Sequence, residues 1–303
     1  MRFVPDQDIP DLSGRVVLVT GANIGLGRET VRQVAKHTPA HIFLAARTRS
    51  KAETTIEELK RENASAAPIS FLELDLASFE SIKKAASTFN SSSERLDLLI
   101  NNAGIMCTPV GTTAEGYELQ FGTNHVGHAL LTRLLLPKLK QTATAHPEVD
   151  VRIVNVSSGG HMMAPTDVYP LADLKGELGI YSTLTRYGLS KLANIHFTQE
   201  LARHNPAIKC VAIHPGLVNT NLTSGWLAFH PWFVHPINLV GWLIGQSVEK
   251  GVLNQLWAAF SPEAKSGAYY FPVGELRHDG KVDNHKAAQE LWKWTEEQLE
   301  GQA

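Results

Sequence analysis

Short apolar runs alternate with helical patterns along most of this chain. The runs are rich in valine, isoleucine and leucine, and they cover residues 15–20, 41–45, 69–74, 96–100, 151–156 and 209–214. Buried parallel strands have this composition, and the helices that connect them fall between consecutive runs. The alternation therefore predicts an α/β fold, a doubly wound, Rossmann-like parallel sheet with helices on both faces.

The length of the chain, 303 residues with 43% hydrophobic side chains, suits one large domain with a substantial core. No internal repeat, low-complexity tract or linker interrupts the sequence before Asp150. We therefore expect a single domain that spans residues 1–303.

A glycine-rich turn follows the first apolar run. Gly21-Ala22-Asn23-Ile24-Gly25-Leu26-Gly27 stands between the strand that ends at Thr20 and a helical pattern that continues to His37. Glycines at such a turn let the backbone approach a pyrophosphate, which then rests on the N-terminus of the helix. The spacing differs from G-x-G-x-x-G, but the flanking strand and helix are those that a dinucleotide site requires.

The second run ends at Ala46-Arg47, where folds that favour NAD commonly carry an acid for the ribose 2′-hydroxyl. No acid stands here, and Arg49 and Lys51 are close by. A guanidinium matches a 2′-phosphate, so the sequence favours NADP(H) over NAD(H), with Arg47 at the phosphate. The alternative is a solvated loop that leads into a helix capped by Ser50, with Glu53 three residues later.

A tyrosine and a lysine, Tyr187 and Lys191, stand four positions apart in a helical pattern. This spacing puts both on one face, so the ammonium can lie below the phenol and lower its pKa from about 10 toward the working range. Ser158 stands just after the fifth run, at the carboxyl end of a strand where open α/β sheets bind ligands. The three residues together predict proton-transfer chemistry beside a bound ligand.

These motifs, in this order, resemble the short-chain dehydrogenase/reductase family, and within it the retinol-dehydrogenase-like members. The resemblance extends from Leu12 to the last helix. The family patterns TGxxxGxG, NNAG, YxxxK and PGxVxT match residues 20–27, 101–104, 187–191 and 215–220, and single-residue positions match Asp75, Asn124 and Ser158.

The resemblance implies an oxidoreductase that transfers hydride between a nicotinamide cofactor, here NADP(H) because of Arg47, and a carbonyl or alcohol. The aromatic side chains of residues 221–245 favour a bulky, mainly apolar small molecule as the substrate. The resemblance makes Tyr187 the general acid in reduction and the base in oxidation, while Lys191 lowers its pKa and holds the nicotinamide ribose. Ser158 polarises the carbonyl, and Asn124 orders a water of a proton relay. The implied cofactor-binding residues are Gly21, Asn23, Ile24, Gly25, Leu26, Gly27, Arg47, Asp75, Leu76, Asn102, Ala103, Tyr187, Lys191, Pro215, Val218 and Thr220. Asn101 is expected to brace the sheet.

Two further segments are candidates for the substrate side. Residues 159–186, which include His161, Met162 and Met163, form a long insert between the serine and the tyrosine. Residues 221–245 are rich in aromatic side chains and follow the last cofactor motif. We expect the second segment to be a lid over the pocket, with a subunit interface of a homo-oligomer and shallow membrane attachment as alternatives.

Other classes of function have little support in the sequence. The net charge of −2, without a basic run, gives no indication of nucleic acid binding. The two cysteines are far apart, and His125 and His128 have no acidic partners nearby, so no metal site is expected. A cytoplasmic, reducing location fits, and no transmembrane span is expected because Pro231 and Pro236 interrupt the most apolar stretch. A catalytically silent NADP(H)-binding regulator and an epimerase or dehydratase on the same fold remain as alternatives.

Overall fold

The computed structural model describes residues 2–63, 67–165, 169–218 and 246–302. Its centre is an eight-stranded sheet in the order β3-β2-β1-β4-β5-β6-β7-β8. The strands are β1 (Val16–Thr20), β2 (His41–Ala46), β3 (Ile69–Glu73), β4 (Leu98–Asn101), β5 (Arg152–Val156), β6 (Lys209–Ile213), β7 (Tyr269–Phe271) and β8 (Glu275–Leu276). All neighbours pair in parallel except β7 and β8, which are antiparallel. The predicted doubly wound sheet is confirmed, with one short antiparallel strand added at its edge.

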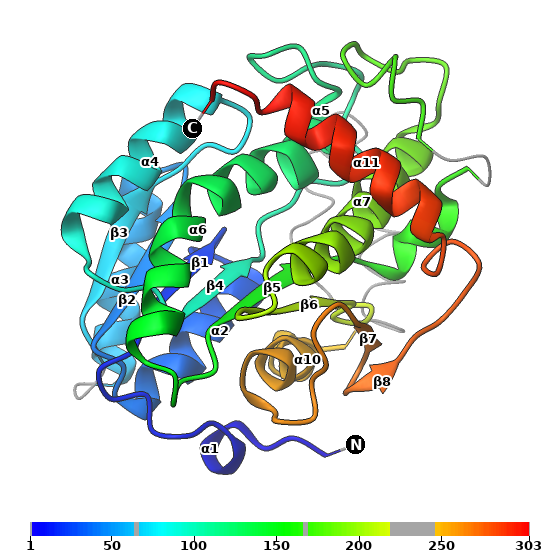
Figure 1. The fold of residues 1–303 in the computed structure, drawn as a ribbon. Helices are drawn as coiled ribbons and strands as arrows, with labels where there is room; N and C mark the ends of the chain where they lie inside the picture. The colour runs from blue at the N-terminus through cyan, green and yellow to red at the C-terminus, as the bar shows by residue number, and fades with distance from the viewer. Residues whose placement is uncertain (1, 64–66, 166–168, 219–245, 303) are drawn as a thin grey trace.

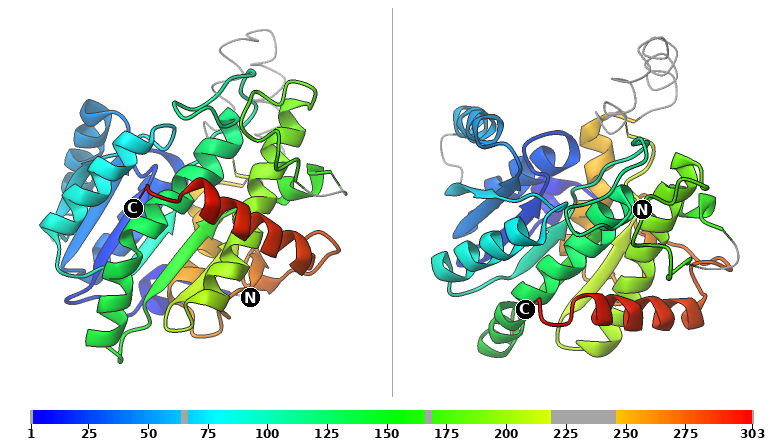
Figure 2. Two further views of the ribbon diagram at one scale, coloured as in Figure 1. Left: turned by 45° about the horizontal axis from the view of Figure 1, so that its top comes forward. Right: turned by 90° about the horizontal axis from the view of Figure 1, so that it is seen from above.

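Helices cover both faces of this sheet (Figure 1). One face carries α2 (Gly25–Val34), α3 (Arg49–Glu62) and α10 (Val248–Phe260), and the other carries α4 (Phe79–Ser92), α6 (Gly127–Ala145) and α7 (Thr183–His204). The remaining helices are α1 (Pro5–Asp8), a 3-10 turn (Ala35–His37), α5 (Leu119–Phe121), a π-helical turn (Gly122–Val126), a second 3-10 turn (Gly159–Met163) and α11 (His285–Gln298). Figure 2 shows that α11 lies across α7, where Trp292 stacks on Phe197 with ring centroids 5.5 Å apart.

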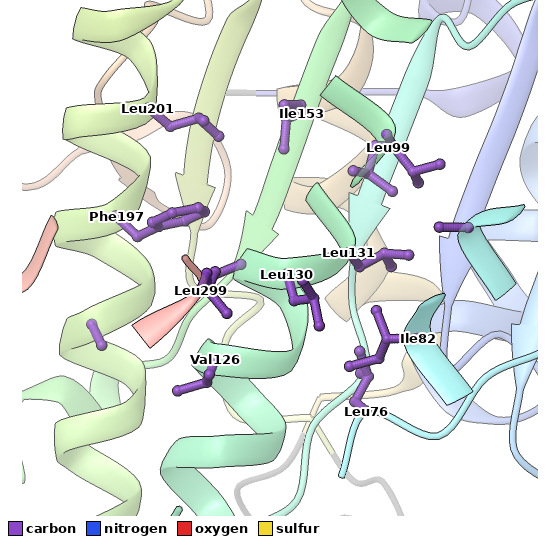
Figure 3. Packing of buried hydrophobic residues seen from close by; sticks show 14 of the residues in the cluster. Leu76, Ile82, Leu99, Val126, Leu130, Leu131, Ile153, Phe197, Leu201 and Leu299 are labelled. Carbon is purple, nitrogen blue, oxygen red and sulfur yellow. The ribbon is translucent and has the colours of Figure 1, made fainter. Parts of the chain in front are cut away.

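Side chains of each strand alternate between two apolar layers. In β1, Val16 and Leu18 join the layer under α4, α6 and α7, whereas Val17 and Val19 join the layer under α2, α3 and α10. Figure 3 shows the first layer, in which Ile153 of β5 lies with leucines of α6. The strands are apolar at consecutive positions because both faces of the sheet are buried.

The helix that contains Asn124 has a complex course. It begins as α5 at Leu119, passes through the π-helical turn and continues as α6 to Ala145. A Cβ atom at Gly127 would lie 2.3 Å from the carbonyl oxygen of Leu76, so the helix approaches the β3 to α4 connection closely. The helix α3 begins at Arg49 with Thr48 as its N-cap, two residues earlier than a cap at Ser50 would require, so Ser50 does not cap it.

Candidate active site

A cleft of about 720 Å³ opens at the carboxyl ends of the parallel strands. It is lined by Gly21, residues 23–26, 46–47, 74–77 and 102–106, Thr108, Leu119, Thr123, residues 156–158, Tyr187, Lys191, residues 215–216, Val218 and Val248. The strand order reverses between β1 and β4, and the cleft contains the loops that follow both of these strands. Such a reversal point is where open α/β sheets bind their ligands.

The glycine-rich turn forms one wall of the cleft. Gly21 and Gly25 have φ angles of 63° and 54°, which side chains other than glycine rarely adopt, and α2 begins at Gly25. Backbone N–H groups at a helix N-terminus favour an anionic group, so a pyrophosphate fits here. Gly27, in contrast, does not line the cleft: a Cβ atom there would lie 2.5 Å from the carbonyl oxygen of Gly21. Gly27 therefore packs closely behind the turn, and the cofactor contact expected of it stays a prediction.

The loop after β4 is fastened to the end of β1. The backbone N–H groups of Asn102 and Ala103 donate to the Thr20 hydroxyl over 2.9 and 3.0 Å, and the Asn102 amide donates to the Thr20 carbonyl over 2.8 Å. Asn101 points into the sheet, where its amide donates to Asn155 over 2.8 Å. Asn102 and Ala103 thus line the cleft and Asn101 braces the sheet, as the sequence predicts.

The loops after β2 and β3 provide the polar end of the cleft. Arg47 and Asp75 both line it, and an Asp75 carboxylate oxygen accepts the backbone N–H of Ala77 over 2.9 Å. Arg49 lies elsewhere, with its guanidinium 4.7 Å from the centre of the Phe71 ring. Arg47 is therefore the arginine of this region that faces the cleft within the described residues.

Ser158, Tyr187 and Lys191 meet at the other end of the cleft. The Ser158 hydroxyl lies near enough to the Tyr187 phenol to lower its pKa, and it accepts the backbone N–H of Gly160 over 3.0 Å. The Lys191 ammonium lies 5.7 Å from the centre of the Tyr187 ring and donates to the carbonyl of Val156 over 3.0 Å. Helix α7 and the end of β5 thus bring together three groups that are 29 and four residues apart in the sequence.

Burial controls the pKa values of this group. It raises the pKa of Tyr187 to about 12, against the opposing effect of the Ser158 hydroxyl, and it lowers the pKa of Lys191 to about 8. The sequence predicts the opposite direction for the phenol, and for the chain alone that prediction is wrong. Desolvation outweighs the opposing effect of Ser158, and the Lys191 ammonium, 5.7 Å from the ring centre, does not reverse it.

Asn124 lies behind the cleft in the π-helical turn and does not line it. Its side-chain oxygen accepts the backbone N–H of Ile105 over 2.8 Å, and its amide donates to the Ile105 carbonyl and the Ser190 hydroxyl, both over 2.9 Å. Asn124 therefore holds the loop after β4 against α7. Its role in ordering a water stays a prediction.

His125 and His128 pack inside the protein. His128 contacts the Thr20 hydroxyl over 2.9 Å, His125 contacts the Thr295 hydroxyl over 3.1 Å, and both imidazoles are buried. Among the residues that the structure describes, no cluster of histidine, cysteine, aspartate and glutamate could hold a metal ion.

Several predictions concern the substrate side. Within its described part, the insert of residues 159–186 contributes no residue to the cleft, and His161 is instead fully buried. Pro215 and Val218 line the cleft, and their contacts with the cofactor stay predictions. Thr220 and the candidate lid 221–245 lie outside the described residues. No helix in the described ranges is both long and apolar enough to span a membrane.

The sequence did not single out the residues that form the apolar wall. Ile105, Met106 and Thr108 follow the end of β4, and Leu119 and Thr123 come from the following helical turns. Ile105, Met106 and Thr108 could have been indicated by their position just after Asn101-Asn102-Ala103-Gly104, because loops at the carboxyl ends of strands line such sites.

Comparisons with known proteins agree with this geometry. Residues 15–169 match the family model for short chain dehydrogenases. Human retinol dehydrogenase 14 is 37% identical over 302 residues, which cover 94% of this chain and 86% of that protein. A crystal structure from Mycobacterium paratuberculosis, a putative uncharacterized protein, is 30% identical with a TM-score of 0.75 and covers 99% of this chain and 98% of its own. The NADPH-bound carbonyl reductase from chicken fatty liver is 25% identical with a TM-score of 0.65, covering 88% of this chain and all of its own.

Proposed function

Because the chain belongs to the short-chain dehydrogenase/reductase family, we propose that it is an NADP(H)-dependent oxidoreductase of bulky apolar carbonyl compounds or alcohols. The observation that supports this proposal most directly is the contact between the buried Tyr187 phenol and the Ser158 hydroxyl inside a cleft of suitable size. The family uses a nicotinamide cofactor, and the bound nicotinamide supplies or takes up the hydride.

The residues of this cleft fit a dinucleotide. Gly21 and Gly25 leave room for the pyrophosphate at the start of α2. Asp75 and Asn102 line the same cleft, where the rest of the dinucleotide would lie. Arg47 offers a guanidinium to a ribose 2′-phosphate, which is the basis for proposing NADP(H) rather than NAD(H). The NADPH bound to the chicken carbonyl reductase is consistent with this choice.

Ser158 and Tyr187 would act on the substrate oxygen. As hydride reaches a carbonyl carbon, negative charge develops on the oxygen, and two hydroxyl donors fixed in advance stabilise it. A phenol whose pKa is raised to about 12 keeps its proton at neutral pH, so Tyr187 is poised as the acid of a reduction. Lys191, held by the carbonyl of Val156, places a positive charge under this proton transfer.

The substrate class follows from the walls of the cleft and from the relatives. Ile105, Met106 and Leu119 line the cleft with apolar side chains. The name of the human relative refers to retinol, a large apolar alcohol. We therefore propose a bulky hydrophobic aldehyde, ketone or alcohol.

The decisive experiment measures the oxidation of NADPH with panels of aldehydes and ketones that differ in size. Replacing Tyr187 with phenylalanine should leave cofactor binding intact and lower turnover by about 10²- to 10⁴-fold, because the proton is lost but the ring remains. Tyr270→Phe is the matched control, since Tyr270 is equally buried but lies outside the cleft. Near-normal turnover by Tyr187→Phe would refute the mechanism, and a wild-type protein that binds NADPH without any turnover would favour the regulator.

A further inference from the structure

A buried histidine connects the active-site serine to the C-terminal part of the chain. The His161 imidazole is fully buried. Its Nδ1 lies 2.9 Å from the carbonyl oxygen of Ser158, and its Nε2 lies 3.1 Å from a carboxylate oxygen of Asp279. Ser158 and Asp279 are 121 residues apart in the sequence, so this contact ties the turn after β5 to the segment between β8 and α11 (Figure 1).

The Ser158 carbonyl and the Asp279 carboxylate are hydrogen-bond acceptors, and the Tyr269 hydroxyl also lies 3.4 Å from Nδ1 of His161. A neutral imidazole donates from one nitrogen alone, whereas an imidazolium donates from both. With Asp279 ionised, Nε2 of His161 is the donor to the carboxylate. The pKa of Asp279 is lowered to about 2: burial acts against this shift, and the backbone N–H of Val282 and the His161 contact outweigh it. The carboxylate of the pair is therefore ionised, and the histidine that contacts it lies inside the protein.

The same segment makes a second contact with the turn. The Lys281 ammonium donates to the carbonyl of Met162 over 2.7 Å and also to the carbonyl of Ala164. Asp279 fixes the shape of its own segment, because its other carboxylate oxygen accepts the backbone N–H groups of Lys281 and Val282, each over 3.0 Å. Asp279 and Lys281 thus reach the turn from one short, internally hydrogen-bonded stretch.

Helix α7 holds this stretch from the other side. The His196 imidazole donates to the carbonyl of Lys281 over 2.8 Å, and the Gln199 amide donates to the carbonyl of Val282 over 2.9 Å. Because α7 also carries Tyr187, the stretch Asp279–Val282 is fixed relative to both the serine turn and the tyrosine helix.

We propose that Asp279 and His161 are positioning residues, and that with Lys281 they clamp the turn Ser158–Ala164 so that the Ser158 hydroxyl stays at the Tyr187 phenol. The proposal rests on the function proposed above for Ser158. None of the three side chains lines the cleft, so their effect passes through the backbone of the turn. A displacement of the hydroxyl by about 1 Å can lower turnover by about 100-fold while the binding of cofactor and substrate is retained.

The test compares Asp279→Ala with Asp279→Asn and His161→Gln in the full-length protein. Asp283→Asn is the matched control, because Asp283 belongs to the same region and pairs over 2.9 Å with His278, a histidine that is exposed. Two quantities are measured: the hydrogen exchange rates of the backbone amides in residues 158–164, and kcat, KM and the Kd of NADPH.

We expect Asp279→Ala and His161→Gln to accelerate exchange at the Gly160 and Ala164 amides and to lower kcat by about 10- to 100-fold, with KM and the Kd of NADPH unchanged. In Asp279→Asn, the exchange rates and kcat should stay closer to those of the wild type than in Asp279→Ala. The amide that this substitution introduces can hydrogen-bond to the neutral imidazole. Asp283→Asn should behave as the wild type.

The proposal is overturned if the backbone amides of residues 158–164 exchange at the same rate in Asp279→Ala as in Asp283→Asn. It is equally overturned if exchange accelerates and kcat does not change, since the turn would then be loosened without consequence. A Ser158→Ala variant with wild-type turnover would instead refute the proposed function, and the exchange rates would still decide whether the clamp exists.

Discussion

Breaking the buried ion pair between Glu118 and Arg186 should be strongly destabilising, and Glu118→Gln tests this. Glu118 is fully buried, Arg186 is 3% exposed, and their closest atoms are 2.9 Å apart. Arg186 also contacts the carbonyl oxygens of Thr108 and Pro109 over 3.2 and 3.4 Å. The pair therefore joins α5 and α7 to the loop that forms the apolar wall of the cleft.

The magnitude follows from what the substitution leaves behind. Removing one partner of a buried pair costs about 3–5 kcal/mol, because the other charge stays buried without compensation. The amide oxygen introduced by Glu118→Gln could still accept the backbone N–H of Phe121, which Glu118 now accepts over 2.6 Å, and Arg186 would keep its contacts with two carbonyls. The expected loss is therefore at the lower end, about 3 kcal/mol, a large share of a typical stability of about 5–15 kcal/mol.

Urea unfolding followed by circular dichroism measures this free energy. The matched control is Glu53→Gln, which breaks an exposed pair with Arg49 at 3.3 Å and should cost about 0.5 kcal/mol or less. The double variant Glu118→Gln/Arg186→Met should lose less than the sum of its single variants, because neither charge remains alone. If Glu118→Gln costs no more than Glu53→Gln, the buried pair does not stabilise this region and the reasoning fails.

Three further predictions concern the cofactor, pH and the substrate side. Arg47→Ala should lower kcat/KM for NADPH relative to NADH by about 10-fold or more, through loss of a charge-assisted hydrogen bond, while Arg49→Ala should keep the ratio; an unchanged ratio in Arg47→Ala would contradict the phosphate role. Burial lowers the pKa of His125 to about 3 and the pKa values of His128, His196 and His214 to about 4. Below the ordinary histidine pKa of 6.5, these side chains therefore bind protons in the unfolded chain but not in the folded chain. The free energy of unfolding should therefore have its full value above this pH and fall progressively toward about pH 4. Equal urea midpoints at about pH 7 and pH 5 would contradict this contribution of the buried histidines. Trp232→Ala and Phe233→Ala should raise KM for large hydrophobic ketones and spare small aldehydes; a change in oligomer size or liposome binding with unchanged kinetics would exclude the lid.

The sequence predicts the sheet well because each strand is marked by the composition of a few consecutive residues. Each strand is buried on both faces and is therefore apolar at consecutive positions, as Val16 to Val19 illustrate. The cofactor turn and the Tyr187 to Lys191 spacing are local patterns too, and the structure places both at the cleft.

Features that depend on contacts between distant residues could not be predicted. The π-helical turn around Asn124 occurs where Gly127 meets the Leu76 carbonyl, and the Glu118–Arg186 pair joins residues 68 positions apart. The pKa of Tyr187 depends on how completely the fold buries the phenol, which four-residue spacing does not reveal. His161 belongs to a segment that the sequence assigned to the substrate side, and its partner Asp279 comes from the other end of the chain.

The antiparallel strand β8 has a consequence for how these molecules can associate. A parallel sheet that ended at β7 would present a row of free backbone donors and acceptors, to which a strand of another molecule could pair. The two-residue strand β8 occupies that row, both of its residues are exposed, and Glu275 places a charge on it. A strand this short and polar is a poor template for further pairing. The sheet is thereby protected at this edge from intermolecular growth into aggregates.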